Sequence, residues 1–306
     1  MIASFFRARD KKSAMSFSDK NEEVSVSFEF FPPADLNNAG RFWDSIDDLA
    51  SLNPSFISIT YGAGGTTRDR SLKILQRILA ETSLDPIAHL TCVGSSKDEA
   101  DDMARQFHAA GITRLVALRG DPPGGQDDFS AHPQGYANAT EFIQGLSKVA
   151  DFDITVAAYP EKHPESPSLE HEIDVLKQKI DAGAKRCITQ FFFDTDVYLR
   201  FVDKARSSGI DIPIIPGILP ILNFSRVQDL AARCGAHIPA WLIDLFEGIE
   251  TSSSTNNMLA AAVVIEQCDK LYAAGVRDFH FYTLNKSDLA RAVCHSLGVR
   301  AEGEST

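Results

Sequence analysis

The sequence lacks the features of several protein classes. No apolar run approaches the roughly 20 residues that a membrane-spanning helix requires, and no short apolar stretch follows the basic start as in a secretory signal. The five cysteines in 306 residues lie far apart, with no C-x-x-C pair and no histidine at zinc-ligand spacing. We therefore expect a cytoplasmic protein with reduced thiols, no membrane association and no metal site.

Positive charge is also scarce. The chain has 30 Lys+Arg against 42 Asp+Glu, a net charge of −12, and no Lys/Arg cluster stands out within its body. This balance argues against a nucleic-acid surface, and any anionic ligand must be met by local cationic groups. A content of 44% hydrophobic and 24% charged residues is that of a soluble globular protein.

Residues 1–22 differ from the rest of the chain. They are polar, basic and aperiodic, and they contain a second methionine, Met15, at which translation can also begin. Such a segment buries too little apolar surface to fold. We predict a disordered tail over 1–22, one folded domain over 23–300 and a short tail over 301–306.

From residue 24 the sequence repeats a unit in which a short β-branched or aromatic run precedes a polar turn and a longer segment of helical periodicity. Strands are predicted at Val24–Phe30, Phe56–Tyr61, Ile87–Val93, Arg114–Arg119, Ile154–Tyr159, Arg186–Phe193, Ile212–Ile218 and Asp278–Leu284. Helices are predicted near 38–52, 68–82, 96–110, 136–150, 168–183, 196–208, 225–235 with 256–274, and 287–297.

Eight such units predict a single (β/α)8 barrel of the α/β class. Parallel strands need crossover helices, and closing the sheet removes both of its edges. An open, doubly wound sheet is the alternative. In a barrel the active site lies at the carboxyl ends of the strands, so the residues at those ends are the candidates for chemistry.

Two carboxylates stand out at the predicted strand ends. Glu29 is flanked by Phe28, Phe30 and Phe31, and a carboxylate in apolar surroundings loses hydration, which suits it to donate a proton near neutral pH. The structural alternative is a strand-end glutamate paired with an arginine. Asp121 precedes two prolines that stiffen its loop, so it is either a ligand-facing carboxylate or part of an Asx turn.

Other groups at the strand ends are less specific. The glycine-rich loop 62–65 opens a helix, where backbone N–H groups bind phosphate, but a tight turn requires glycine as well. His89, His163 and Lys179 could neutralise a pyrophosphate, but a single His or Lys is more often a structural or surface group, and only their shared location suggests such a site. The run Phe191–Phe193 is expected to be core packing rather than a ring-stacking platform.

Nine segments resemble the methylenetetrahydrofolate reductase family, from about Val24 to Arg300. They are FEFFPP, ITYGAGGTTRDR, AHLTCVG, VALRGDPP, VAAYPEKHPE, ITQFFFD, PGILPILNF, IPAWL and FHFYTLN. The resemblance implies a barrel of the bacterial single-domain type with non-covalent FAD across its carboxyl-terminal mouth. It also implies reduction of 5,10-methylenetetrahydrofolate to 5-methyltetrahydrofolate with NADH or NADPH, in one-carbon metabolism and methionine synthesis, and a homo-oligomer.

The resemblance assigns roles to individual positions. Glu29 matches the general acid, Asp121 the aspartate that helps to bind folate and tunes the flavin, and Gln190 a residue shared by folate and nicotinamide. Positions matching the FAD lining are Thr60, Tyr61, Ala63, His89, Arg119, Gly120, Asp121, Tyr136, Ala137, Ala157, Tyr159, His163, Ser166, Glu172 and Lys179. Substrate positions are Glu29, Thr60, Asp121, Gln190, Arg226, Leu230, Tyr282 and Lys286.

Five positions depart from the relatives. Glu172 and Val175 replace Asp and Asn near the ribose and adenine end of FAD, Arg226 and Leu230 replace an amide and an aromatic, and Lys286 replaces an arginine. Lysine cannot reproduce the bidentate fork that arginine forms on a carboxylate. The adenine end, the folate tail and the nicotinamide are therefore expected to be held differently here.

The resemblance implies ping-pong kinetics on one flavin face, in which nicotinamide reduces the flavin and folate then takes its place. Glu29 would assist protonation at N10 of the folate, and Asp121 would offset the positive charge on the opened ring. Two alternatives stay open: a pterin-binding barrel that transfers a methyl group without flavin, and a non-catalytic folate or flavin binder. Fold alone does not separate them, but a yellow protein that nicotinamide bleaches fits only the reductase.

Overall fold

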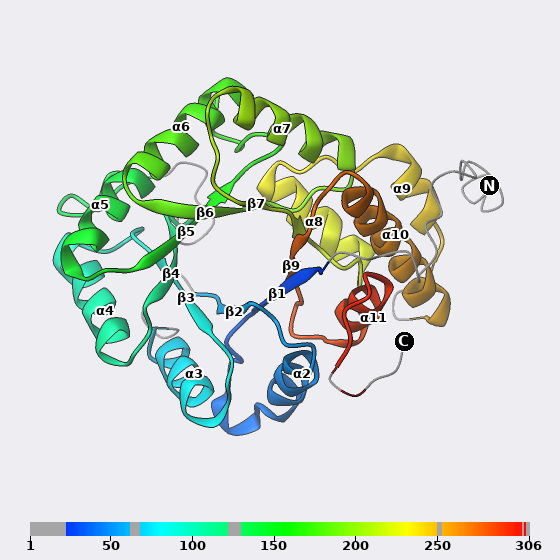
Figure 1. Cartoon of the computed structure of the whole chain (residues 1–306), viewed down its shortest axis with the longest axis horizontal. Coiled ribbons are helices and arrows are strands. Elements are labelled where there is room, and N and C mark those ends of the chain that lie inside the picture. Colours follow the sequence, from blue (N-terminus) through cyan, green and yellow to red (C-terminus); the bar gives the residue numbers. More distant parts are fainter. Residues whose placement is uncertain (1–22, 62–67, 122–129, 250–252, 302, 304–306) are drawn as a thin grey trace.

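The computed structural model describes residues 23–61, 68–121, 130–249, 253–301 and 303. Its strands are all parallel and form a nearly closed ring with helices outside it (Figure 1). The predicted barrel is therefore confirmed. The predicted tail over 1–22 and the glycine-rich loop 62–65 lie outside the described residues, as does most of the predicted tail over 301–306.

The strands follow the predicted runs closely. They are β1 Ser25–Phe30, β2 Phe56–Ile59, β3 Pro86–Thr91, β4 Arg114–Leu118, β5 Asp153–Ala158, β6 Ala184–Thr189, β7 Ile214–Ile215, β8 Gly217–Ile218 and β9 Asp278–Tyr282. The seventh predicted run is split at Pro216, because proline has no N–H for the ladder. β7 pairs with β6 and β8 pairs with β9, so the split segment closes the ring.

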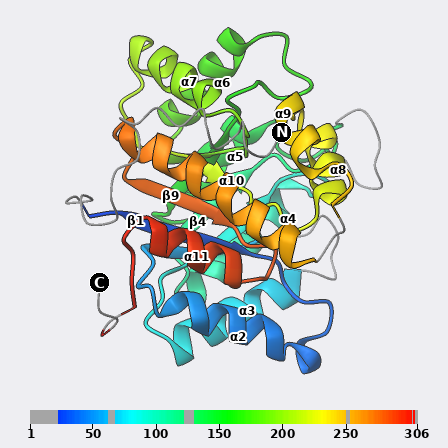
Figure 2. The same cartoon turned by 90° about the vertical axis from the view of Figure 1, so that its right-hand side faces the viewer.

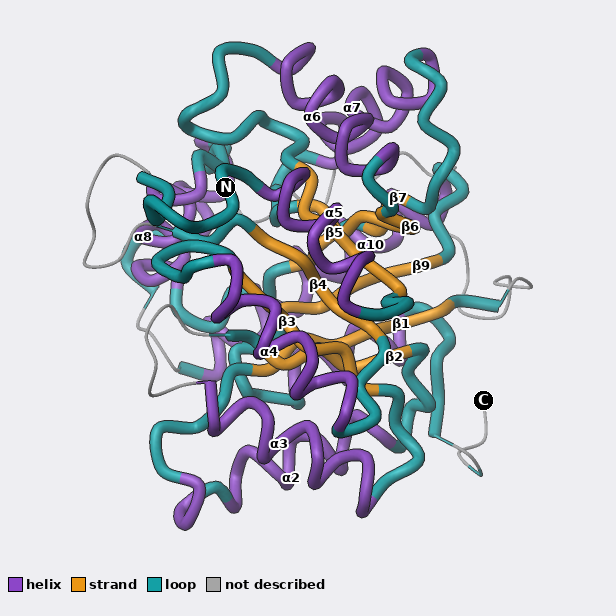
Figure 3. Tube along the Cα trace, turned by 90° about the vertical axis from the view of Figure 1, so that its left-hand side faces the viewer, coloured by secondary structure: helices purple, strands orange, loops and turns teal. Residues whose placement is uncertain are grey.

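The helices surround the strands on the outside of the molecule (Figure 3). They are α2 Gly40–Ala50, α3 Arg68–Glu81, α4 Lys97–Ala109, α5 Ala139–Val149, α6 Leu169–Asp181, α7 Thr195–Ser207, α8 Phe224–Cys234, α9 Ala240–Phe246, α10 Ser254–Ala273 and α11 Asp288–Ser296, with a 3-10 turn at Leu36–Asn38. Local sequence sets their starts: at α4, Ser96 and Glu99 form a reciprocal capping box. Helices α10 and α11 cover β9 and β1 (Figure 2).

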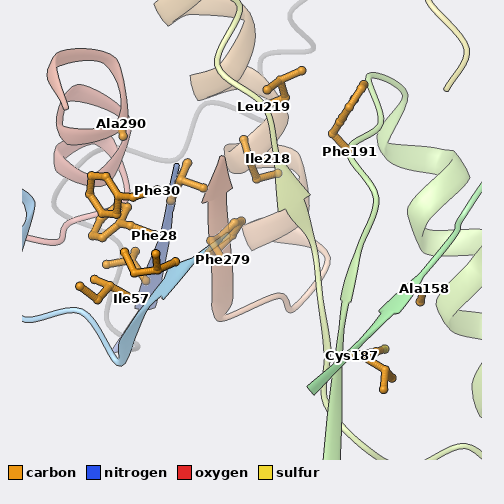
Figure 4. Packing of buried hydrophobic residues seen from close by; sticks show 14 of the residues in the cluster. Phe28, Phe30, Ile57, Ala158, Cys187, Phe191, Ile218, Leu219, Phe279 and Ala290 are labelled. Atoms are coloured by element: carbon orange, nitrogen blue, oxygen red, sulfur yellow. The ribbon is translucent and has the colours of Figure 1, made fainter. Parts of the chain in front are cut away.

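Apolar side chains form two layers, because successive residues of a strand point to opposite faces. The outer layer lies between strands and helices and includes Phe28, Phe30 and Phe279 (Figure 4). The inner layer fills the barrel with Phe56, Ile87, Val116, Ile188 and Ile215. This inner plug forms the floor of the barrel, and its Val116 and Ile188 also line the cavity above it.

Ion pairs cover the amino-terminal end of the barrel below this plug. Arg186 binds Asp153 through two hydrogen bonds of 2.9 Å. Arg114 pairs with Asp85, and its Nε lies 3.5 Å from the Asp153 carboxylate. Arg114 and Asp153 begin their strands, Asp85 directly precedes β3, and Arg186 is the third residue of β6.

Within the described residues, no helix is both long enough and apolar enough to span a membrane.

Candidate functional site

A cavity of about 790 Å³ lies at the carboxyl ends of the strands. This volume is in the range of ligand and cofactor sites, roughly 300–1,000 Å³. The ends of strands all around the ring contribute to its wall, as the barrel topology requires. The predicted site residues in the wall are Glu29, Thr60, Tyr61, His89, Arg119, Gly120, Asp121, Ala157, Tyr159, His163, Ser166, Glu172, Lys179, Gln190, Leu230 and Tyr282.

Four predicted positions do not line this cavity. The Tyr136 hydroxyl donates to Asp101 Oδ1 at 2.7 Å, and its ring packs so closely on Gly145 that a Cβ there would lie 2.0 Å from the hydroxyl. Ala137, Arg226 and Lys286 are exposed on the protein surface. A fifth predicted position, Ala63, lies outside the described residues.

Glu29 points into the barrel, away from its sequence neighbours. Phe28 and Phe30 lie on the outer face. The ring centroid of Phe28 is 5.9 Å from that of Phe281, and the ring centroid of Phe30 is 5.9 Å from that of Phe42. For Phe28 and Phe30, the prediction that the flanking phenylalanines desolvate the carboxyl group was wrong, because strand side chains alternate; Phe31 does line the same cavity as Glu29. Glu29 is nevertheless 8% exposed, because the barrel interior itself excludes water.

Two histidines, rather than an arginine, face the Glu29 carboxylate in the described part of the chain. Its Oε2 lies 3.5 Å from His89 Nε2 and 3.9 Å from His280 Nε2. Both imidazole nitrogens are buried and have no hydrogen-bond partner among the described residues. The far nitrogen of His280, Nδ1, is 2.8 Å from the Ser27 hydroxyl, which itself donates to Phe279 O. The Glu29 carboxylate therefore lies next to two groups that can each carry a proton, the imidazoles of His89 and His280.

Burial lowers the pKa of His89, and the neighbouring His280 lowers it further, while the Glu29 carboxylate opposes both effects. The net direction is downward, so His89 is neutral at neutral pH. A neutral imidazole beside a carboxyl group carries one exchangeable proton and one acceptor. This corner of the cavity can therefore hold and pass a proton.

Arg119 supplies a fixed positive charge to another part of the wall. Its Nη2 donates to Glu165 Oε1 at 3.1 Å, and Nη1 donates to the second oxygen. The hydrogen bond from Arg119 lowers the pKa of the Glu165 carboxyl. Nearby, burial is the main cause that lowers the pKa of His163, with Arg119 adding to it, so His163 is neutral while Arg119 carries the charge.

Two buried side chains of α6, Glu172 and Lys179, hold the end of β5 and the loop that follows it. Glu172 accepts hydrogen bonds from the His163 N–H at 3.1 Å and from the Ser166 hydroxyl. Lys179 Nζ donates to Ala157 O at 2.9 Å, and burial lowers the pKa of this ammonium group. Glu172 thus reaches from α6 to the loop that carries His163, and it shapes the cavity wall.

Tyr282 lies across the split seventh strand. Its hydroxyl donates to Thr189 O at 2.8 Å, and burial followed by the Glu29 charge raises its pKa, so the phenol stays protonated. A Cβ at Gly217 would lie 2.1 Å from Thr189 O and 2.6 Å from the Tyr282 ring. Glycine is therefore required at 217 for this ring to line the cavity.

Sequence reasoning missed several residues of the wall or its support. Phe31 and Glu165 line the cavity, and His280 faces Glu29 from β9. The period of two in a strand was an available signal, because it places His280 on the same face as Tyr282. Phe191–Phe193 are buried as predicted, and Phe191 contributes to the wall as well.

No group of three or more His, Cys, Asp or Glu side chains is arranged to hold a metal ion in the part of the chain that the structure describes.

The fold and this arrangement of residues can be compared with known proteins. The family model described as methylenetetrahydrofolate reductase matches residues 15–298. The chain belongs to the methylenetetrahydrofolate reductase family. The 5,10-methylenetetrahydrofolate reductase of Escherichia coli (strain K12) is 45% identical over 298 residues, which cover 97% of this chain and 99% of that protein.

A plant member of the methylenetetrahydrofolate reductase family and one solved structure extend the comparison. The Arabidopsis thaliana protein named methylenetetrahydrofolate reductase (NADH) 1 is 36% identical over 92% of this chain, and the match covers 50% of the plant protein. A solved Clostridium thermocellum protein that binds two copies of 5-methyl-5,6,7,8-tetrahydrofolic acid has a TM-score of 0.60 at 17% identity, with 91% and 96% of the two chains covered. That likeness concerns the fold.

Proposed function

We propose that this protein reduces 5,10-methylenetetrahydrofolate to 5-methyltetrahydrofolate, with FAD as bound cofactor and NADH or NADPH as electron donor. The observation that carries the proposal is the buried Glu29 carboxyl, which lines a cavity of ligand size and faces two imidazoles. The names of the family and its members support the folate substrate, and the plant relative's name supports NADH. A cytoplasmic homo-oligomer serving one-carbon metabolism and methionine synthesis is part of the same proposal.

The cavity wall fits the chemistry of FAD. In a chain of net charge −12, the lining contains Arg119 and Lys179, and a pyrophosphate requires cationic partners. Binding there would draw Arg119 from Glu165 and Lys179 from Ala157 O. Buried His89 Nε2 has no hydrogen-bond partner among the described residues and can bond a polar ring edge. Bound FAD would carry hydride from the nicotinamide to the folate. Proposed holding residues are Thr60, Tyr61, His89, Arg119, Gly120, Asp121, Ala157, Tyr159, His163, Ser166, Glu172 and Lys179.

Glu29 is proposed to protonate N10 of the folate. Breaking the bond between N10 and the one-carbon unit places negative charge on the leaving nitrogen, which a general acid neutralises. The two imidazoles beside Glu29 can hold the carboxyl proton between turnovers. Asp121 is exposed at the mouth of the cavity, where its charge offsets the positive charge that remains on the opened ring.

The remaining predicted substrate residues divide by position. Gln190, Leu230 and Tyr282 line the cavity and are proposed to contact the ring systems of folate or nicotinamide. Arg226 and Lys286 are exposed and lie outside the wall. If they act on a ligand, they bind a portion that projects from the cavity, such as an anionic tail.

An anaerobic redox cycle tests the proposal. The purified protein should carry FAD, lose its flavin absorbance on mixing with NADH or NADPH, and regain it when 5,10-methylenetetrahydrofolate is added, with 5-methyltetrahydrofolate as product. The more effective nicotinamide is identified in the same experiment. A colourless protein that transfers a methyl group, or a yellow one that neither nicotinamide bleaches, contradicts the proposal.

A further inference from the structure

The ladder between β1 and β9 continues beyond its last backbone pair through a side chain. Its register ends with Glu29 opposite Tyr282. Beyond that pair, the Phe31 N–H donates to Asn285 Oδ1 at 2.8 Å, and Asn285 Nδ2 donates to Phe31 O at 2.8 Å. One amide side chain thus supplies the donor and the acceptor that a neighbouring strand residue would supply.

The backbone around Asn285 is held in an unfavourable conformation. Leu284 and Asn285 have φ values of 51° and 59°, in the left-handed region that residues other than glycine seldom adopt. Asparagine tolerates this region better than most residues, but leucine does not. Two consecutive left-handed residues beside a cavity indicate that the surrounding contacts impose this conformation.

Hydrogen bonds to β1 and to α2, and one within the turn itself, hold this turn. The buried Thr283 hydroxyl donates to Glu29 O at 2.6 Å and accepts the Asn285 N–H at 3.1 Å. The Ser45 hydroxyl of α2 donates to Asn285 O at 3.2 Å. The backbone of Glu29 and the backbone of Phe31 are thus both tied to the segment after β9.

This arrangement places the ring of Phe31 at the cavity. Phe31 is 41% exposed, yet it lines the cavity wall two residues after Glu29. An exposed aromatic face at a binding site stacks favourably on a planar ring. Both substrates of the proposed reaction carry such a ring, the pterin of the folate and the nicotinamide.

We propose that Asn285 is a positioning residue that clamps the Phe31 backbone, so that the Phe31 ring forms a fixed wall of the substrate site next to Glu29. Phe31 is then a substrate-binding residue, and Asn285 acts through it. This inference rests on the proposed function for the identity of the stacked ring. The clamp itself does not, because it is a property of the protein alone.

Asn285→Gly tests the clamp, because glycine accepts the left-handed backbone but has no side-chain amide. Exchange of the Phe31 amide hydrogen should accelerate at least about tenfold, because its hydrogen bond is lost. FAD content and the thermal midpoint should stay near those of the parent. Asn53→Gly is the matched control: Asn53 is exposed, has a φ of 51° and lies in the turn after α2, so exchange and kinetics should not change.

The kinetic arm compares Asn285→Gly with Phe31→Leu, which keeps an apolar side chain but removes the ring. In both variants the KM for the folate should rise about three- to tenfold, the size of a lost stacking contact. In Asn285→Asp, which keeps the acceptor but not the donor, the rise should be smaller. A merely structural residue would lower the thermal midpoint and leave KM unchanged.

Several results overturn the inference. An unchanged folate KM in Phe31→Leu shows that the ring is not a wall of the site. Unchanged Phe31 amide exchange in Asn285→Gly shows that Asn285 is only a turn residue. If the parent protein fails to react with folate at all, the proposed function fails instead, and the exchange experiment still decides whether the clamp exists.

Discussion

The two ends of the barrel hold their charged groups in different ways. At the amino-terminal end, Arg186 and Asp153 share two hydrogen bonds of 2.9 Å, and Arg114 pairs with Asp85. The carboxyl-terminal end also has an ion pair, Arg119 with Glu165, but its Glu29 carboxylate faces two imidazole nitrogens that have no hydrogen-bond partner in the described part of the chain. Paired charges stabilise a fold, whereas buried polar groups without partners cost free energy and are retained where a ligand or a reaction uses them.

This contrast indicates which end of the barrel tolerates substitution without loss of function. The apolar plug formed by Phe56, Ile87, Val116, Ile188 and Ile215 separates the two sets of charges, so little coupling between them is expected. Substitutions at the amino-terminal end should alter stability and spare turnover. Substitutions at the carboxyl-terminal end should do the reverse, which is the usual division of labour in barrel enzymes.

Glu29→Gln should give the largest effect. It preserves shape but removes the acid, and general acid catalysis contributes about 10²–10⁴-fold. Re-oxidation of reduced flavin by methylenetetrahydrofolate should slow by at least about two decades, whereas flavin reduction by nicotinamide should stay within a few-fold. Anaerobic stopped-flow absorbance measures both steps. Loss of FAD, or equal slowing of the two steps, would make Glu29 a structural or positioning residue.

Asp153→Asn should have the next largest effect, on stability. It removes the charge shared by Arg186 and Arg114, and because these groups are partly exposed, we expect a loss of about 1–2 kcal/mol in the free energy of unfolding. Denaturant unfolding measures it. Asp102→Asn is the control, because its pair with Arg105 is exposed and should contribute below about 1 kcal/mol. A fall in folate turnover larger than the loss of folded protein would break the distinction between the two ends.

The architecture was predictable because it depends on periodicity along the chain. Alternating units of strand and helix fixed the barrel, and the carboxyl ends of parallel strands had to meet, which brought Glu29, His89, Arg119 and Tyr282 together. Helix α9, Ala240–Phe246, was missed because seven residues are too few to show a helical period. The split at Pro216 followed from its missing N–H, which the sequence already showed.

The parts of the site that were not predicted depend on contacts between distant segments. Asn285 and Phe31 are 254 residues apart, and Arg119 and Glu165 are 46 apart, so no local pattern marks either pair. Resemblance placed Tyr136 at the cofactor, yet its side chain packs on Gly145 and bonds to Asp101. A motif fixes which residue is present but not the direction in which its side chain points.

Asp121→Asn should have a moderate effect at the carboxyl-terminal end. If flavin and folate bind as proposed, removing the negative charge of Asp121 should weaken folate binding about three- to tenfold, because the side chain is exposed and its field is screened. The flavin reduction potential should rise, because reduced flavin is then less repelled. Equilibrium titration and a potential measurement test the two parts. If neither changes, Asp121 is a turn residue only.

His89→Gln should give the smallest effect, visible only as a change with pH. Burial holds the pKa of His89 below its ordinary value of 6.5, so the unfolded chain binds this proton more readily than the folded protein. The free energy of unfolding should therefore fall as pH drops below 6.5, by at most about 1.4 kcal/mol per pH unit.

Removal of the imidazole should flatten this fall. Glu29 and His280 face His89 and are present in both proteins, so the comparison isolates His89. Denaturant unfolding between pH 7 and pH 5 gives the two slopes, and equal slopes would show that His89 does not resist protonation.

The central claim is that the carboxyl-terminal cavity is a site for a flavin dinucleotide. Titration of the apoprotein with FAD and with FMN, followed by flavin fluorescence and by the thermal midpoint, tests it directly. We predict that one FAD binds per chain, that FAD raises the midpoint more than FMN at equal concentration, and that Asp153→Asn binds FAD as the parent does. Failure to bind FAD, or equal affinity for FMN, would contradict the account.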